Sequence, residues 1–225
     1  MSLATSVVPT PGRAPELRFR VDGSGSLPFA AVPTLRFALR VEAEGGEPVR
    51  SVLLDAQIQI AARRRDYDPA AQERLLELFG APERWASTLR TLPWLRTTLV
   101  VPPFTGSTVV ELLVPCTYDL EVTASRYLAA LTDGVVPLEF LFSGSVFFSS
   151  EAGKLQIARI AWDREIDYEL PVAVWREMMD RHFRGTAWLR VDADRFGRLC
   201  AYKARHAFAS WDAAIDSLLD GREGA

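Results

Sequence analysis

The chain has few of the residues from which enzymes usually build reactive sites. Its 225 residues include two cysteines, two histidines and, among 26 cations, only two lysines. Cys116 and Cys200 stand far apart without a CxxC pair, which excludes a zinc ribbon and a dithiol redox motif. Two histidines cannot supply a multi-histidine metal site. We expect His182 and His206 to be ordinary surface or helix-capping residues.

The sequence also lacks long apolar runs and the common catalytic signatures. No window holds about 20 consecutive apolar residues, and residues 1–15 do not read as a secretion signal. The nucleophile elbow, the phosphate-binding loop, the dinucleotide fingerprint and HExxH are all missing. A net charge of −3 provides no field that would gather nucleic acid or anionic lipid. We therefore expect a cytoplasmic protein that inserts into no membrane, binds no nucleic acid, metal or cofactor, and has no catalytic residues.

What is present is the balance of a folded globular protein. Hydrophobic residues make up 48% and charged residues 24% of the chain, and a chain of this length can bury a sizeable core without a disulfide or metal. Residues 1–15 carry Pro9, Pro11 and Pro15 without any regular period. We expect a flexible leader over residues 1–15 and a single α+β domain over residues 16–225.

Alternation of apolar and polar residues predicts several β-strands. The clearest pair covers residues 34–43 and 49–62, and Gly45 and Gly46 between them predict an antiparallel hairpin. Pro115 lies inside another alternating segment, where it predicts an edge, a bulge or a break. Five further strands are expected at residues 17–21, 95–101, 110–122, 138–148 and 155–169.

Helix signals accompany these strands. Asp68-Pro69 places a capping residue before a proline at the first helical position, and Gly80 ends that helix. An amphipathic helix begins at Pro171. Other helical segments are expected near Pro82 and at residues 125–131, 194–208 and 210–219. Together the elements predict an α+β fold, in which an antiparallel sheet is built from hairpins, with inserted short helices and C-terminal helices packed on it.

The strand expected at residues 138–148 is apolar on both faces. This pattern is typical of a central strand covered on both sides, or of a strand whose second face meets a partner. The helix that begins at Pro171 also carries an apolar stripe. We therefore predict a partner-binding surface formed by Phe140, Phe142, Phe147, Phe148, Trp175 and Met179.

Four carboxylates alternate along one face of an expected strand, namely Asp163, Glu165, Asp167 and Glu169. Their side chains would stand about 7 Å apart, so full ionisation costs some repulsion. We expect a solvated outer face. A docking surface for a basic partner is the first alternative, and a metal site is less favoured because it needs more oxygens from other elements. Asp119 and Glu121 could form an acid-base pair only if burial raised one pKa.

Five segments carry a resemblance to a known family: residues 114–119 (VPCTYD), 137–144 (PLEFLFSG), 170–180 (LPVAVWREMMD), 201–205 (AYKAR) and 210–214 (SWDAA). They resemble an uncharacterised actinobacterial family of unknown function, whose members are often encoded near the genes of a NiFe uptake hydrogenase. The resemblance implies an accessory protein for that enzyme and supplies no catalytic residues. The expected architecture also resembles the export chaperone SecB, whose oligomer binds unfolded clients.

Three functions are consistent with these observations. The first is a non-enzymatic accessory or binding protein with a protein partner, which the resemblance identifies with hydrogenase subunits or maturation factors. The second is a small-molecule-binding protein or enzyme with a pocket between sheet and helices. The third is a structural homo-oligomer whose apolar faces pair with each other.

Overall fold

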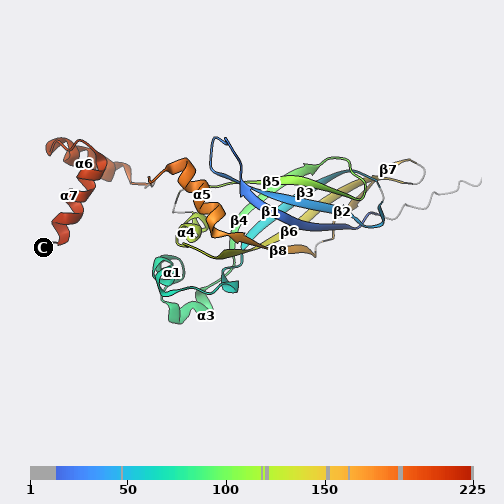
Figure 1. Ribbon diagram of the computed structural model, residues 1–225, viewed down its shortest axis with the longest axis horizontal. Helices are drawn as coiled ribbons and strands as arrows, with labels where there is room; N and C mark the ends of the chain where they lie inside the picture. Colours follow the sequence, from blue (N-terminus) through green and yellow to red (C-terminus); the bar gives the residue numbers. More distant parts are fainter. Residues whose placement is uncertain are drawn as a thin grey trace, which may run out of the picture. The chain divides into compact units, whose positions relative to one another are not determined.

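Two antiparallel sheets face each other in the first part of the chain (Figure 1). The computed structural model describes residues 14–46, 48–117, 119, 122–150, 153–161, 163–186 and 190–223. The chain divides into two compact units, Met1–Ala187 and Trp188–Ala225. That residues 16–225 act as one domain stays a prediction.

The smaller sheet holds three strands in the order β1-β2-β5. These are β1 (Leu17–Ser26), β2 (Thr34–Ala43) and β5 (Ser107–Pro115), and both pairings are antiparallel. The strand expected at residues 110–122 thus ends at Pro115, because proline has no N–H to continue the ladder. The sequence predicted that the strand would continue past Pro115. Two residues of that predicted continuation, Tyr118 and Leu120, lie outside the described residues.

The larger sheet is centred on β3 (Val49–Ile60) and β6 (Val135–Ser149). β4 (Leu92–Val101) pairs with the free side of β3. On its other side β6 pairs with two strands in succession. Its first half pairs with β8 (Arg164–Pro171) and its second half with β7 (Leu155–Arg159).

Gly144 marks the point where β6 exchanges one partner for the other. Phe142 pairs with β8, and Ser145 pairs with β7. Gly144 adopts a φ of 137°, and a Cβ built on it would lie 2.1 Å from the carbonyl oxygen of Leu53. The strand therefore requires glycine here, because only glycine combines this backbone angle with so close an approach of β3.

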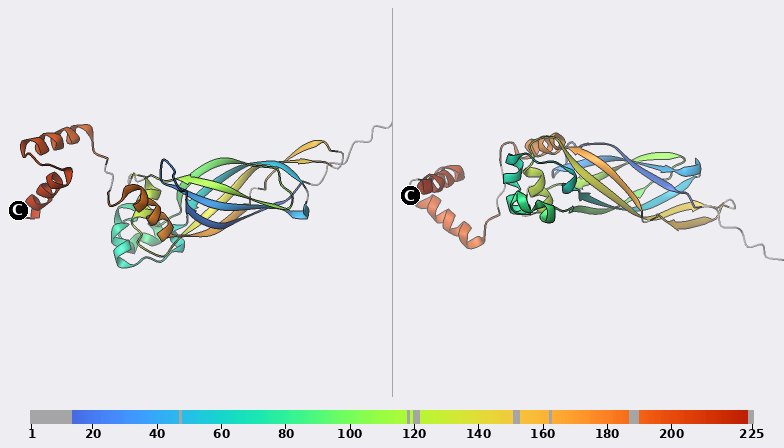
Figure 2. Two further views of the ribbon diagram at one scale, coloured as in Figure 1. Left: turned by 45° about the horizontal axis from the view of Figure 1, so that its top comes forward. Right: turned by 90° about the horizontal axis from the view of Figure 1, so that it is seen from below.

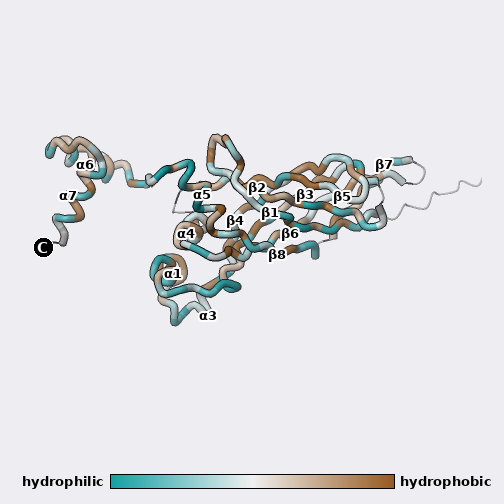
Figure 3. The backbone as a smooth tube through the Cα atoms, in the orientation of Figure 1, coloured by the Kyte–Doolittle hydropathy of each residue, from teal (hydrophilic) through white to brown (hydrophobic). Residues whose placement is uncertain are grey.

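The main core lies between the two sheets. Figure 3 shows hydrophobic and hydrophilic residues succeeding one another along the strands, which is the pattern of sheets with one buried face. Rings meet across the interface: Phe19 stacks on Phe142 with centroids 4.4 Å apart, and Phe37 meets Phe140 edge-on at 5.2 Å. Phe37 and Phe140 are fully buried. These contacts fix the sheets face to face in a sandwich.

The expected hairpin between residues 34–43 and 49–62 is wrong. β2 and β3 are consecutive and both alternate, but they belong to different sheets. The turn Glu44–Gly46, with Gly45 at a φ of 86°, carries the chain across the sandwich from one sheet to the other. Alternation reports which face of a strand is buried, and both arrangements bury the same faces.

Short helices gather at one end of the strands (Figure 2). The connection from β3 to β4 contains α1 (Pro69–Arg74), α2 (Leu76–Phe79) and α3 (Trp85–Thr88). Asp68 caps α1, since its carboxylate accepts a hydrogen bond of 2.7 Å from the Ala71 N–H. This agrees with the capping signal in the sequence.

Two further helices belong to the same unit. α4 (Thr123–Ala129) lies between β5 and β6 in the chain, and α5 (Val172–Phe183) follows Pro171 as expected. α5 packs on β1, β2 and β8. The Trp188–Ala225 unit contains α6 (Ala193–Arg205) and α7 (Trp211–Glu223). Antiparallel sheets accompanied by helices confirm the α+β class.

Candidate functional site

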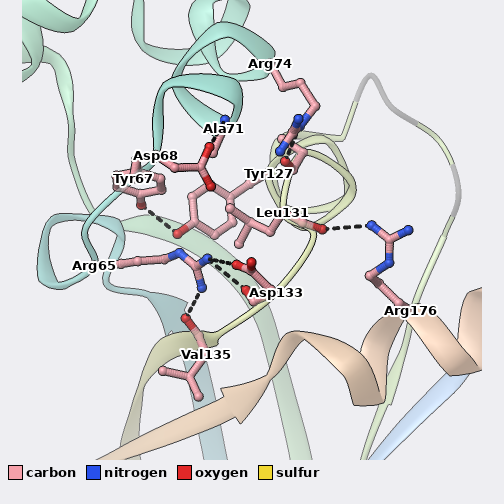
Figure 4. Close-up of polar contacts among 11 residues, drawn as sticks. Arg65, Tyr67, Asp68, Ala71, Arg74, Tyr127, Leu131, Asp133, Val135 and Arg176 are labelled. Carbon is pink, nitrogen blue, oxygen red and sulfur yellow. Dashed lines mark hydrogen bonds and ion pairs between the residues drawn. The ribbon is translucent and has the colours of Figure 1, made fainter.

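The most elaborate polar cluster in the described chain surrounds the loop from α4 to β6 (Figure 4). Three arginines from different elements donate to its carbonyls. Arg74 donates to Ala130 at 2.6 Å, Arg176 to Leu131 at 3.2 Å, and Arg65 to Asp133 at 2.8 Å and also to Val135. The Ala130 and Leu131 carbonyls lie at the C-terminal end of α4, where the helix dipole makes a nearby cation favourable. These arginines thus fix the position of α4 on the sandwich.

Two tyrosines pack beside this loop. The Tyr67 and Tyr127 hydroxyls are 2.7 Å apart, and the Tyr67 hydroxyl donates to the Ala62 carbonyl at 2.7 Å. Burial raises the pKa of Tyr127 strongly and that of Tyr67 as well. Both phenols are neutral near pH 7, so neither is suited to general-base work. The cluster has the chemistry of a structural junction.

The free energy of unfolding is expected to fall at alkaline pH. A tyrosine whose folded pKa is raised keeps its proton where the unfolded chain loses it, above about pH 10. Cys116 adds to this effect, since burial raises its pKa from 9.0 to about 12. The contribution of these groups to the free energy of unfolding is thus fully present below their pKa values in the unfolded chain. It declines as the pH rises above those values. Urea midpoints measured from neutral to strongly alkaline pH test this; Tyr127→Phe should show a shallower decline, and a flat wild-type profile would contradict it.

The predicted partner surface is mostly buried, which corrects the expectation from the sequence. Phe140, Phe142 and Phe148 face the space between the sheets and are exposed by 3% or less. Trp175 and Met179 lie on the buried side of α5 and are exposed by 4% or less. The three phenylalanines pack the core because they lie on the inward face of β6, and the two α5 residues because they lie on the buried side of that helix. Phe147, on the opposite face of β6, is the one member that reaches solvent.

An apolar patch nevertheless covers part of the outer face of the larger sheet. Val100 on β4 is opposite Leu53 on β3, and Phe147 on β6 is opposite Ile157 on β7. Leu53 and Phe147 lie diagonally across the β3–β6 pairing, within reach of each other. Exposed fractions reach 67% for Val100 and 63% for Ile157. We call these residues the outer patch: Leu53, Val100, Phe147, Leu155 and Ile157.

Small polar residues surround the outer patch. Ser51 is opposite Phe147, and Ser145 is opposite both Leu53 and Arg159. The guanidinium of Arg50 donates to the Ser149 hydroxyl at 2.9 Å. The serines leave the middle of the outer patch uncovered, and the arginines Arg50 and Arg159 stand at its edges. The outer patch is therefore accessible to a flat partner surface.

The predicted acidic row lies on the same sheet. All four members, Asp163, Glu165, Asp167 and Glu169, are exposed. Glu139 on β6 is opposite Asp167 on β8, so it extends the acidic row onto the neighbouring strand. Arg64 bridges these two carboxylates, at 2.8 Å from Glu139 and 2.6 Å from Asp167. Arg164 lies 4.0 Å from Asp163 and also pairs with Glu16, so two arginines among five carboxylates leave this end of the face negative.

Sequence patterns contained a signal for the outer patch that the prediction did not use. Leu53 stands between the inward-facing Val52 and Leu54, and Val100 stands between Leu99 and Val101. Each is an apolar residue at a position where the alternation calls for a polar one. Such out-of-phase residues on strands identify exposed apolar surface more directly than the richest aromatic segment does.

The remaining candidate residues have ordinary surroundings. The Nδ1 of His182 is 2.9 Å from the Met178 carbonyl, within its own helix. His206 packs beside Tyr202, with ring centroids 4.5 Å apart. Asp119 is described without its expected companion, because Glu121 lies outside the described residues. Among the described residues, no group of three or more His, Cys, Asp or Glu side chains could hold a metal ion.

The loop between β1 and β2 carries another exposed apolar side chain, that of Phe29. Phe29 is fully exposed and adopts a φ of 56°, an unusual value for a bulky residue. The loop is held at its base, where Arg181 donates to the Ser26 hydroxyl at 2.9 Å and Cys116 donates its N–H to the Pro33 carbonyl at 2.7 Å. A fixed loop presents its aromatic tip at little cost in conformational entropy.

Together these features define an α+β sandwich protein with an exposed apolar patch on one sheet face. A family model described as a family of unknown function (DUF6084) matches residues 14–225, and the chain belongs to this family. A comparison with characterised proteins found no match. No helix in the described ranges is long and apolar enough to span a membrane.

Several solved structures show a weak likeness to the chain. The putative ApaA protein from Bordetella pertussis is 13% identical, with a TM-score of 0.25 over 72% of this chain and 98% of that one. β-Glucosidase 3B from Thermotoga neapolitana is 13% identical, with a TM-score of 0.25 over 69% of this chain and 17% of the enzyme. The β-glucosidase from Kluyveromyces marxianus is 10% identical, with a TM-score of 0.23 over 69% and 15%. Likenesses this weak define neither fold nor activity.

Proposed function

We propose that this chain is a non-enzymatic accessory protein that binds a protein partner through the outer face of its larger sheet. The outer patch carries this proposal. Its members come from four different strands, and Val100, Leu155 and Ile157 are each more than 60% exposed. Fully burying an aliphatic side chain contributes about 1.5–3 kcal/mol, so covering such a patch provides a driving force for association.

The charge on the same face defines the partner's chemistry. The outer patch lies where β6 pairs with β7, and the acidic row lies where β6 pairs with β8. A partner that covers both must offer apolar side chains at one end and basic side chains at the other. The carboxylates would act mainly on orientation and association rate, because exposed ion pairs add little affinity.

The family resemblance supports a more specific partner. Since the resemblance of the sequence segments implies that related chains are often encoded beside a NiFe uptake hydrogenase, we propose that the partner is a subunit or maturation factor of that enzyme. A chaperone-like variant of the same role, as in SecB, would use the outer patch for unfolded clients. Preferential binding of folded hydrogenase subunits would support the accessory role, and preferential binding of unfolded chains would support the chaperone-like role.

Affinity purification from the native host tests the surface. The tagged chain is expected to retain hydrogenase subunits or maturation factors, and the double variant Phe147→Asp, Ile157→Asp should retain at least about tenfold less. Val109→Asp, Leu113→Asp is the matched control, because these residues are 46% and 41% exposed on β5 in the other sheet. Far-UV circular dichroism should be unchanged in both. Equal recovery by all three proteins would refute the assignment of this face.

A further inference from the structure

The unit formed by α6 and α7 buries very little for two helices. No residue of α6 is buried, and Ala214 is the one buried residue among those whose burial is described in α7. Units shorter than about 40 residues rarely hold a fold alone without a disulfide, a metal or an oligomeric partner. The hairpin therefore needs another surface to complete its core.

An apolar stripe is available for that purpose. On α7, Trp211, Ile215, Leu218 and Leu219 follow the spacing of one helix face, and each is 40% exposed or more. Phe196 on α6 adjoins this face, since its ring lies 5.7 Å from that of Trp211. We call these five residues the hairpin stripe.

Contacts within the hairpin fix how the stripe is presented. The Tyr202 hydroxyl on α6 is 2.9 Å from the Ser217 hydroxyl on α7. Lys203 donates to the Phe208 carbonyl at 2.8 Å and lies 5.7 Å from the centre of the Trp211 ring. The two helices are thus tied together before any partner arrives, which lowers the entropic cost of association.

Charge divides sharply between the two helices. α6 carries four cations, Arg195, Arg198, Lys203 and Arg205, against the single carboxylate of Asp194, for a net charge of +3. Over residues 211–221, α7 carries the three carboxylates of Asp212, Asp216 and Asp220 and no cation, for a net charge of −3. The unit therefore contains one basic helix and one acidic helix.

We propose that two copies of this chain dimerise through the hairpin stripe. A two-fold axis places α6 of each copy against α7 of the other, so both new helix pairs join opposite charges while the apolar stripes meet in the centre. The arrangement is self-complementary, as an isologous interface requires. It uses a surface separate from the outer patch and does not depend on the proposed function.

The mass of the full chain in solution tests the proposal. Sedimentation equilibrium is expected to give twice the chain mass of 25.0 kDa. Ile215→Asp, Leu219→Asp should give the single-chain mass at the same concentration, because charges enter the centre of the interface. The control Val109→Asp, Leu113→Asp should remain dimeric. A monomeric wild type at every concentration would overturn the dimer and assign the stripe to the first unit of the same chain or to another protein.

Complementary charge reversals test the pairing of the helices even if one variant folds poorly alone. One chain carries Arg198→Glu and Arg205→Glu, which makes both its helices negative. A second carries Asp216→Arg and Asp220→Arg, which makes both helices positive. Each alone should dimerise more weakly than the wild type, and an equimolar mixture should restore the dimer as a heterodimer. A mixture that dimerises no better than its components would overturn the pairing of α6 with α7.

Discussion

Gly144→Ala is expected to lower the free energy of unfolding by about 3 kcal/mol or more. The new Cβ would lie 2.1 Å from the Leu53 carbonyl oxygen and 3.1 Å from its carbonyl carbon, and both atoms belong to the backbone of the neighbouring central strand. No side-chain rotation relieves a contact with backbone, so β3 and β6 must separate locally. The positive φ of 137° adds strain for any residue with a Cβ.

Urea denaturation followed by circular dichroism measures this loss. Gly23→Ala is the matched control, because a Cβ at Gly23 in β1 meets nothing within 4 Å. That change should alter the free energy of unfolding by no more than about 1 kcal/mol. If Gly144→Ala is as stable as the wild type, the close approach of β3 and β6 at this point is refuted.

Phe140→Ala is expected to cost about 3–5 kcal/mol of the free energy of unfolding. Phe140 is fully buried, meets Phe37 of the opposite sheet at 5.2 Å and lies beside Phe142 at 6.3 Å. Truncation leaves a cavity between two sheets whose backbones are held by their ladders, so the core closes only partly.

Phe147→Ala provides the comparison on the same strand. Its ring lies on the outer face and is only half-buried, so the loss of stability should be about 1 kcal/mol or less. Thermal melts or urea titrations of the two variants give the contrast directly. Equal losses would contradict the assignment of Phe140 to the core and Phe147 to the surface.

Sequence patterns predicted the elements of this fold better than their arrangement. Alternation located β2, β3 and β6, and the signal at Asp68-Pro69 located α1. The placement of β2 and β3 in opposite sheets was not predictable, because a hairpin and a crossing between sheets bury the same faces. Which strands pair depends on contacts between segments far apart in the chain, and a local period carries no information about them.

The candidate site shows the same limit. The apolar character of β6 was correctly recognised, but its aromatic residues serve the core, and Phe147 alone belongs to the outer patch. The exposure of the acidic row was expected, whereas its neighbour Glu139 and the bridging Arg64 come from other parts of the chain. A patch whose members come from four strands becomes visible only when the register of those strands is known.

The central pairing of β3 with β6 has a consequence for how the chain folds during synthesis. Its register joins Val49 to Phe148 and Ile60 to Leu138, so the middle of the larger sheet cannot form until most of the first unit has left the ribosome. Non-local pairings of this kind fold slowly, in milliseconds to seconds. At a translation rate of about 5–20 residues per second, β6 is synthesised several seconds after β3. The apolar face of β3 remains without this partner strand for that time. During this period a chaperone that holds unfolded chains could bind the exposed apolar face of β3 in the nascent chain.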